Sequence, residues 1–157
     1  MNEFSVAPEH PLNLKTLLAM DFGEKFIGVA TFCVNRDPYP TPYGRIQNIN
    51  EQHVYIELKK IINDESIDIM IIGVPHLLDG KQTKMTLKAQ AFINNIVKQF
   101  TLPVYEQDET LSTFEAESRM KNSPQYNFQV DLKKIDAVAA SVILEDFIRR
   151  KRKDSGL

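Results

Sequence analysis

Asp21 is an acidic residue at the end of a predicted buried strand, where a charged side chain is unfavourable. It directly follows the apolar run Leu17–Met20, and Gly23 comes two residues later. A carboxylate on a buried strand costs free energy unless it is paired, hydrogen-bonded or bound to a metal ion. An aspartate at a strand end can also stabilise the turn that follows it through the glycine. This segment by itself leaves a chemical role and a turn-capping role open.

Asp136 is the more informative acid, because helical spacing places it among apolar side chains. Its stripe on the predicted helix also carries Leu132, Ala140 and Ile143. A carboxylate inside an apolar arc has a raised pKa unless a partner neutralises it, which favours a functional role. The alternative is an ion pair with one of three cations: Lys15, Lys25 and Arg119.

Glu109 and Asp108 follow another predicted strand and precede a helix whose start is marked by Ser112 and Glu115. Acids before a helix are favoured by its dipole, so this stretch alone indicates no chemistry. If the strand ends and the last helix converge, however, three carboxylates meet and require a cation. Oxygen ligands of this kind select Mg²⁺ or Mn²⁺. Two such ions, about 4 Å apart, commonly serve phosphoryl transfer.

The elements that must position these acids form the order β-β-β-α-β-α-β-α-α. Alternation, apolar runs and turn residues predict strands at Leu17–Phe22, Phe26–Val34, Tyr43–Asn48, Ile67–Val74 and Leu102–Tyr105. Helical spacing predicts helices at Glu51–Ile62, Thr83–Phe100, from Ser112 onward, and at Asp131–Arg150 with Asp131 as N-cap. We therefore expect an α/β fold with a mixed sheet and helices on its faces, whose ligands lie outside the strand ends.

Composition limits the class of protein. The chain has 157 residues, 43% of them apolar and 25% charged, with a net charge of -2. We expect one domain at residues 15–150, a flexible N-terminal extension at 1–14 and a basic C-terminal tail at 151–157. A nucleic-acid partner would need a local basic patch. Cys33 is the single cysteine, which fits a cytoplasmic protein, and no apolar run is long enough to span a membrane.

Four segments of the chain together resemble the YqgF or RuvX family. They are AMDFGEKFIGVA, IIGVPHLLDGKQTK, VYEQDETLSTFEAESRM and KKIDAVAASVILEDFI, and they occur in the family's order. The family is Holliday-junction-resolvase-like, and its members are regarded as candidate pre-16S rRNA nucleases. The resemblance implies an RNase H-like fold with a five-stranded mixed sheet whose first three strands are antiparallel. It also implies that Asp21, Glu109 and Asp136 are the catalytic acids and hold Mg²⁺ or Mn²⁺.

The chain departs from the family pattern at two positions next to these acids. The family commonly has arginine where this chain has Phe26, and again where it has Thr110. The family's loop before the last helix is often glycine-rich and basic, whereas here it contains no glycine. Both departures at single positions remove positive charge near the expected site.

Basic side chains around the expected site are candidates for contacts with nucleic acid. Lys25 and Lys81 follow predicted strand ends, and Arg119 is expected opposite them, near Lys133 and Lys134. Each of these side chains can equally be solvated surface. The loop at 126–128 carries aromatic rings that could stack on an unpaired base or dock onto the core.

These features favour a metal-dependent endonuclease acting on a phosphodiester of structured RNA, such as precursor rRNA. A Holliday-junction resolvase acting on branched DNA and a catalytically weak nucleic-acid-binding factor are the alternatives. An ATP-binding protein of the actin and sugar-kinase type shares the fold, but it needs two lobes and this chain supplies one. We expect a cytoplasmic monomer or weak homodimer with nucleic acid as its partner and no association with membranes.

Overall fold

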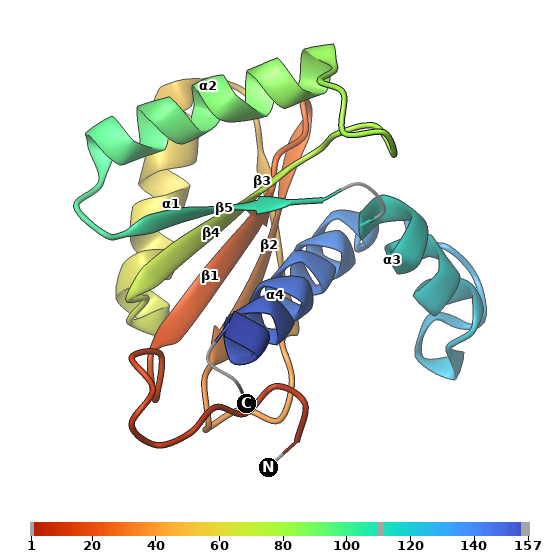
Figure 1. The fold of residues 1–157 in the computed structure, drawn as a ribbon. Helices are drawn as coiled ribbons and strands as arrows, with labels where there is room; N and C mark the ends of the chain where they lie inside the picture. The colour runs from red at the N-terminus through yellow and green to blue at the C-terminus, as the bar shows by residue number, and fades with distance from the viewer. Residues whose placement is uncertain (1, 110–111, 155–157) are drawn as a thin grey trace.

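The computed structural model describes residues 2–109 and 112–154. Its centre is a five-stranded sheet in the order β3-β2-β1-β4-β5 (Figure 1). The strands are β1 (Thr16–Asp21), β2 (Phe26–Cys33), β3 (Thr41–Gln47), β4 (Ile69–Val74) and β5 (Val104–Asp108). The helices are α1 (Glu51–Glu65), α2 (Lys84–Gln99), α3 (Ser112–Lys121) and α4 (Ile135–Asp154), with a short 3-10 helix, η1, at Pro124–Tyr126. The order of the elements is the one the sequence predicts.

The sheet is mixed, as expected. Strand β1 pairs antiparallel with β2 and parallel with β4, while β3 and β5 form the two edges. Strand β4 is buried at every position, which explains its continuous apolar run, because a central parallel strand has no solvent-facing side. The carboxyl ends of β1, β4 and β5 therefore meet at one edge of the sheet.

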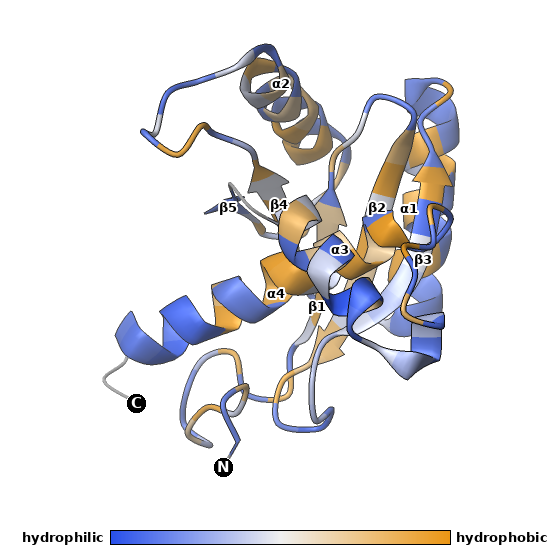
Figure 2. Ribbon diagram, turned by 90° about the vertical axis from the view of Figure 1, so that its right-hand side faces the viewer, coloured by the Kyte–Doolittle hydropathy of each residue, from blue (hydrophilic) through white to orange (hydrophobic). Residues whose placement is uncertain are grey.

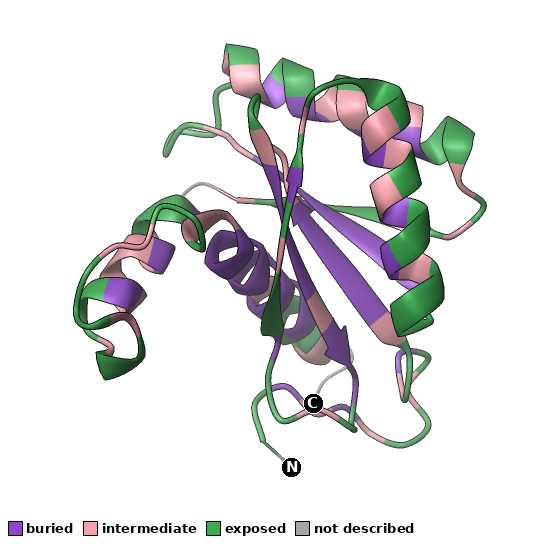
Figure 3. Cartoon of the chain, turned by 180° about the vertical axis from the view of Figure 1, so that it is seen from behind, coloured by how far each residue is buried: buried purple, intermediate pink, exposed green. Residues whose placement is uncertain are grey.

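Helices cover both faces of the sheet (Figure 1). Leu18 and Met20 face a core completed by α1 and α2, whereas Leu17 and Ala19 face a core completed by α4. Figure 3 shows that α4 is buried over much of its length. Figure 2 shows apolar strands inside and a hydrophilic end of α4 outside. Helix α3 packs against α4 beyond the sheet.

Several predicted boundaries differ from the observed ones by one to four residues, and two of these differences have a clear physical cause. Helix α4 begins at Ile135 and not at Asp131, because the Asp131 side chain caps a local turn by accepting a hydrogen bond from the Lys133 amide at 2.9 Å. Strand β5 spans Val104–Asp108 and not Leu102–Tyr105, because its pairing with β4 continues as far as Val74. An edge strand is held by its ladder even where its side chains are polar, so hydrophobicity alone misplaces its end.

The N-terminal segment, residues 2–14, was expected to be a flexible extension. It contains no helix or strand, yet Phe4, Val6 and Leu12 are buried in the core beneath α4. The division of the chain at residues 15 and 150 stays a prediction. Among the described helices, none has the length and apolar character needed to cross a membrane.

Candidate active site

Asp21 lies at the last position of β1, between two glycines on the neighbouring strands. Gly28 of β2 is its antiparallel partner and Gly73 of β4 is its parallel partner. A Cβ atom on Gly73 would overlap the end of the Ile143 side chain of α4. The strand neighbours of Asp21 therefore carry no side chains, so α4 can approach the sheet closely at this point.

Gly28 brings the second acid to the first. A Cβ atom at this position would overlap the main-chain carbonyl of Asp136 in the first turn of α4. The backbone of the helix therefore rests directly on the backbone of β2, opposite Asp21. This contact joins segments more than 100 residues apart and places Asp136 beside Asp21.

The two aspartates repel each other in a partly buried place. Burial, together with the smaller effect of the nearby negative charge of Asp136, raises the pKa of Asp21 to about 7. Burial also raises the pKa of Asp136, while the cation of Arg45 lowers it. Burial thus disfavours the charged form of both carboxylates, and Arg45 offsets this only in part and only for Asp136.

Among the described residues, the cation paired with Asp136 is not one of the three expected. Arg45 of β3 places Nη1 3.9 Å from Oδ2 of Asp136. Its guanidinium lies over the ring of Phe26, 3.6 Å from the centroid, and donates a long hydrogen bond of 3.4 Å to the Leu132 carbonyl. Sequence reasoning missed Arg45, although the lost basic residue at Phe26 was a signal to look for a cation on the strand beside it.

Glu109 joins the aspartates in one hollow of about 270 Å³. The Glu109 amide donates to the Val74 carbonyl at 2.9 Å, which continues the pairing of β4 and β5 past the end of β5. The hollow is lined by Asp21, Gly23, Gly73, Glu109, Ser112 and Asp136, among others. Neighbouring Thr110, where the family pattern has arginine, lies outside the described residues.

The donor set of this hollow fits a hard divalent cation. Carboxylate oxygens are the ligands that Mg²⁺ and Mn²⁺ prefer, and a bound cation would favour the charged form of Asp21 that burial and the neighbouring Asp136 disfavour. Within residues 2–109 and 112–154, however, no three acidic, histidine or cysteine side chains converge closely enough to enclose a metal ion. Asp21, Glu109 and Asp136 line a shared hollow without forming a closed cage.

The basic candidates fall into two groups. Lys25 and Lys81 are exposed, and Lys81 lies 3.8 Å from Asp79. Arg119 is engaged within the protein, because it pairs with Glu115 at 3.0 Å and with the nearly buried Glu145, whose Oε1 accepts from Nη2 at 2.8 Å. None of the three lines the hollow that Asp21, Glu109 and Asp136 share, although Arg119 lines a neighbouring hollow together with Glu109. Their contact with nucleic acid stays a prediction.

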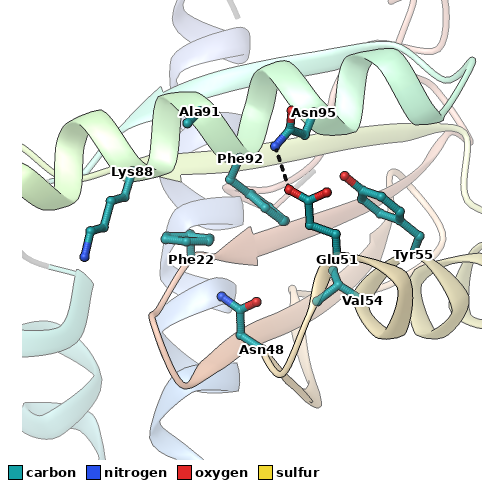
Figure 4. Close-up of a pocket in the computed structure, with 9 residues that line it drawn as sticks. All are labelled: Phe22, Asn48, Glu51, Val54, Tyr55, Lys88, Ala91, Phe92 and Asn95. Atoms are coloured by element: carbon teal, nitrogen blue, oxygen red, sulfur yellow. Dashed lines mark hydrogen bonds between the residues drawn. The ribbon is translucent and has the colours of Figure 1, made fainter.

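A second hollow, of about 240 Å³, lies between α1 and α2 (Figure 4). The rings of Phe22 and Phe92 lie 4.9 Å apart at its wall, and Asn95 donates to Glu51 at 3.3 Å. Phe22 lines this hollow and also the acidic one. The residue after Asp21 thus separates an apolar hollow from a charged one.

A mixed five-stranded sheet with acids at its strand ends and a helix across one face defines the RNase H-like class. The structure titled "Thermus thermophilus RuvC structure" matches 87% of this chain and 97% of its own, with a TM-score of 0.51. At 9% identity, this likeness shows the fold alone. It confirms the expected RNase H-like architecture.

The chain belongs to the RuvX family, because the family profile described as "RuvX: Holliday junction resolvase" matches residues 15–150. Several relatives carry the name "Putative pre-16S rRNA nuclease". The one from Shewanella oneidensis is 32% identical and covers 87% of this chain and 95% of its own. The one from Paraburkholderia phytofirmans is 34% identical and covers 85% and 87%. The one from Salmonella arizonae is 33% identical and covers 86% and 96%.

Proposed function

We propose that the protein is a divalent-metal-dependent endonuclease that processes precursor 16S rRNA in the cytoplasm. The observation that carries the proposal is the convergence of Asp21 and Asp136 at the strand ends, with Glu109 in the same hollow. The choice of precursor rRNA as substrate comes from the names of the relatives, and the assignment to the nucleases comes from the family.

Each acid has a role that its position supports. Asp21 ends the central strand β1, Glu109 follows the edge strand β5, and Asp136 lies on α4 against β2. Asp21 would contact both halves of a metal site, while Glu109 and Asp136 would each complete one half. A bound Mg²⁺ or Mn²⁺ supplies an activated water and stabilises the leaving oxygen. The β1 backbone and the close packing of α4 on Gly28 hold Asp21 and Asp136 in place before substrate arrives.

Replacing one acid tests the proposal. We expect Asp21→Asn to abolish Mn²⁺-dependent cleavage of a 5′-extended 16S rRNA fragment, because the amide keeps the shape of the side chain and loses its charge. Asp64→Asn, on the exposed end of α1, is the matched control and should cleave like the wild type. Cleavage by Asp21→Asn at the wild-type rate would show that the acids are not the catalytic centre.

Branched DNA is the second candidate substrate, because the family profile carries the description of a Holliday junction resolvase. The same preparations can be offered a four-way DNA junction and the rRNA fragment at equal concentration. Faster cleavage of the RNA supports the proposal, and symmetric incision of the junction alone would replace it. Tight binding without cleavage of either substrate, with Mg²⁺ or Mn²⁺, would identify a nucleic-acid-binding factor instead.

A further inference from the structure

A groove of about 590 Å³ runs along the edge strand β3, apart from the acidic hollow. One wall comes from residues 39–44, which include Tyr39 and Gly44, and the other from η1, α3 and the start of α4. The second wall carries Tyr126, Lys133 and Lys134. The volume is that of a site for a small organic ligand or a few linked nucleotides.

The groove is positively charged although the whole chain is not. Its lining includes Arg119 and Glu145, which neutralise each other through their ion pair. Lys133 and Lys134 remain, and the described residues offer neither of them a salt bridge. The chain has a net charge of -2, so the groove is a local basic patch of the kind that a nucleic-acid partner requires.

Arg45 connects this groove to the acids. It directly follows Gly44 of the groove wall, and its guanidinium lies 3.9 Å from Asp136 of the acidic hollow. The side chain is 28% exposed, and the ring of Phe26 beneath it restrains the guanidinium plane. A restrained cation therefore lies next to the groove wall in sequence and beside the acidic hollow in space.

The guanidinium also has unused capacity to bind. Among the described residues it makes one hydrogen bond, the long one to Leu132, and its distance to Asp136 is too great for another. Arginine has five N–H donors arranged to bind phosphate oxygens. Phosphates approaching three carboxylates are repelled, so a cation at the entrance stabilises the approach.

We propose that the groove binds a single-stranded segment of nucleic acid next to the bond that is cut, and that Arg45 contacts the phosphate where this strand enters the acidic hollow. Lys133 and Lys134 hold the backbone, and Tyr39 and Tyr126 offer rings on which unpaired bases stack. The place of the cut rests on the function proposed above, whereas binding in the groove does not.

Binding in the groove is measured by fluorescence anisotropy with a short labelled oligouridylate, in the presence of a chelator so that no metal-dependent cleavage intervenes. For Lys133→Ala with Lys134→Ala we expect affinity to fall about tenfold and the salt slope to fall by about 1.4, because two single-strand phosphates lose their partners. The matched control is Lys59→Ala with Lys60→Ala, two adjacent exposed lysines on α1. Equal affinities and slopes for both double variants would overturn the proposal.

The proposed contact between Arg45 and phosphate is tested by removing, conserving or relocating the positive charge of this side chain. Arg45→Ala should weaken oligouridylate binding about fivefold, and Arg45→Lys should retain part of it, because lysine keeps the charge without the planar fork. Adding Phe26→Arg to Arg45→Ala should restore binding, since it returns a cation to the same place. Arg36→Ala, an exposed arginine paired with Asp37, is the control. Unchanged binding by Arg45→Ala, with thermal melting intact, would remove Arg45 from the strand's path.

The two proposals fail separately. Cleavage by Asp21→Asn at the wild-type rate would refute the nuclease centre and leave the anisotropy results as evidence for the groove. Loss of cleavage by that variant, with normal binding by all groove variants, would refute the groove alone.

Discussion

At the scale of single residues, Asp21 makes stability depend on pH. Its folded pKa of about 7 lies above the ordinary 3.8, so the folded protein holds this proton more tightly than the unfolded chain. The resulting stabilisation is complete below about pH 4 and is lost as pH rises towards 7. Without metal, we therefore expect Asp21→Asn to be more stable than wild type at pH 8, by up to about 4 kcal/mol.

Urea unfolding in the presence of a chelator measures this difference at pH 4.5 and at pH 8. The advantage of the asparagine variant should shrink at the lower pH, where the wild-type carboxyl is protonated in the folded state. Adding Mn²⁺ at pH 8 should stabilise the wild type more than the variant, because the ion binds the folded site. An advantage of equal size at both pH values would show that the buried charge of Asp21 is not its cause.

At the scale of elements, the contact between β2 and α4 depends on Gly28. A methyl group there would overlap the Asp136 carbonyl, which belongs to the backbone and cannot rotate away. We expect Gly28→Ala to lower the free energy of unfolding by about 3 kcal/mol, at the upper end for an overpacked core, and to reduce cleavage by displacing Asp136. Chemical denaturation and the rRNA cleavage assay measure the two effects.

Gly73→Ala is the matched comparison, because its methyl group would meet the movable end of the Ile143 side chain. A rotamer change can relieve that contact, so the cost should be about 1 kcal/mol, at the lower end of the same range. If both variants lose equal stability, the backbone contact at Gly28 is not what sets the position of α4.

The elements also show which physical signals the sequence carries. The central strand β4 was predictable because burial on both faces makes its sequence uniformly apolar. The start of α4 was not, because Asp131 looks like an N-cap and instead caps a turn. The extent of β5 depends on its ladder with β4, which no local pattern records.

At the scale of the whole molecule, some residues of the candidate site could be recognised from the sequence and others could not. Asp21 and Asp136 could be singled out from the sequence because each is a charge in an apolar setting, while Glu109 needed the family pattern. The structure places all three in one hollow, and their catalytic role stays a prediction. Arg45 was missed because its partner Asp136 is 91 residues away in the sequence. Only the packing of β3 beside the start of α4 brings the two together, and this packing is a property of the complete fold.

The complete fold also brings the N-terminal segment into contact with the end of α4. Phe4 is buried against Phe32, with ring centroids 6.3 Å apart, and the Arg149 guanidinium lies 5.2 Å from the ring centroid of Phe4. The Arg152 side chain also donates to the Asn2 carbonyl at 2.9 Å. These contacts clamp the N-terminal segment onto the far end of α4, so we expect Phe4→Ala to destabilise the protein by about 3 kcal/mol.

Thermal and urea unfolding of Phe4→Ala measure this loss, with Leu14→Ala as the control, because Leu14 belongs to the same segment and is 62% exposed. A stability loss confined to Phe4→Ala would show that the segment completes the core beneath α4. Cleavage should fall little at low temperature, since the segment packs beneath α4 with Leu17, whereas Asp21 lies at the opposite end of β1. Equal stability of both variants and the wild type would instead show that residues 2–14 are dispensable for the fold.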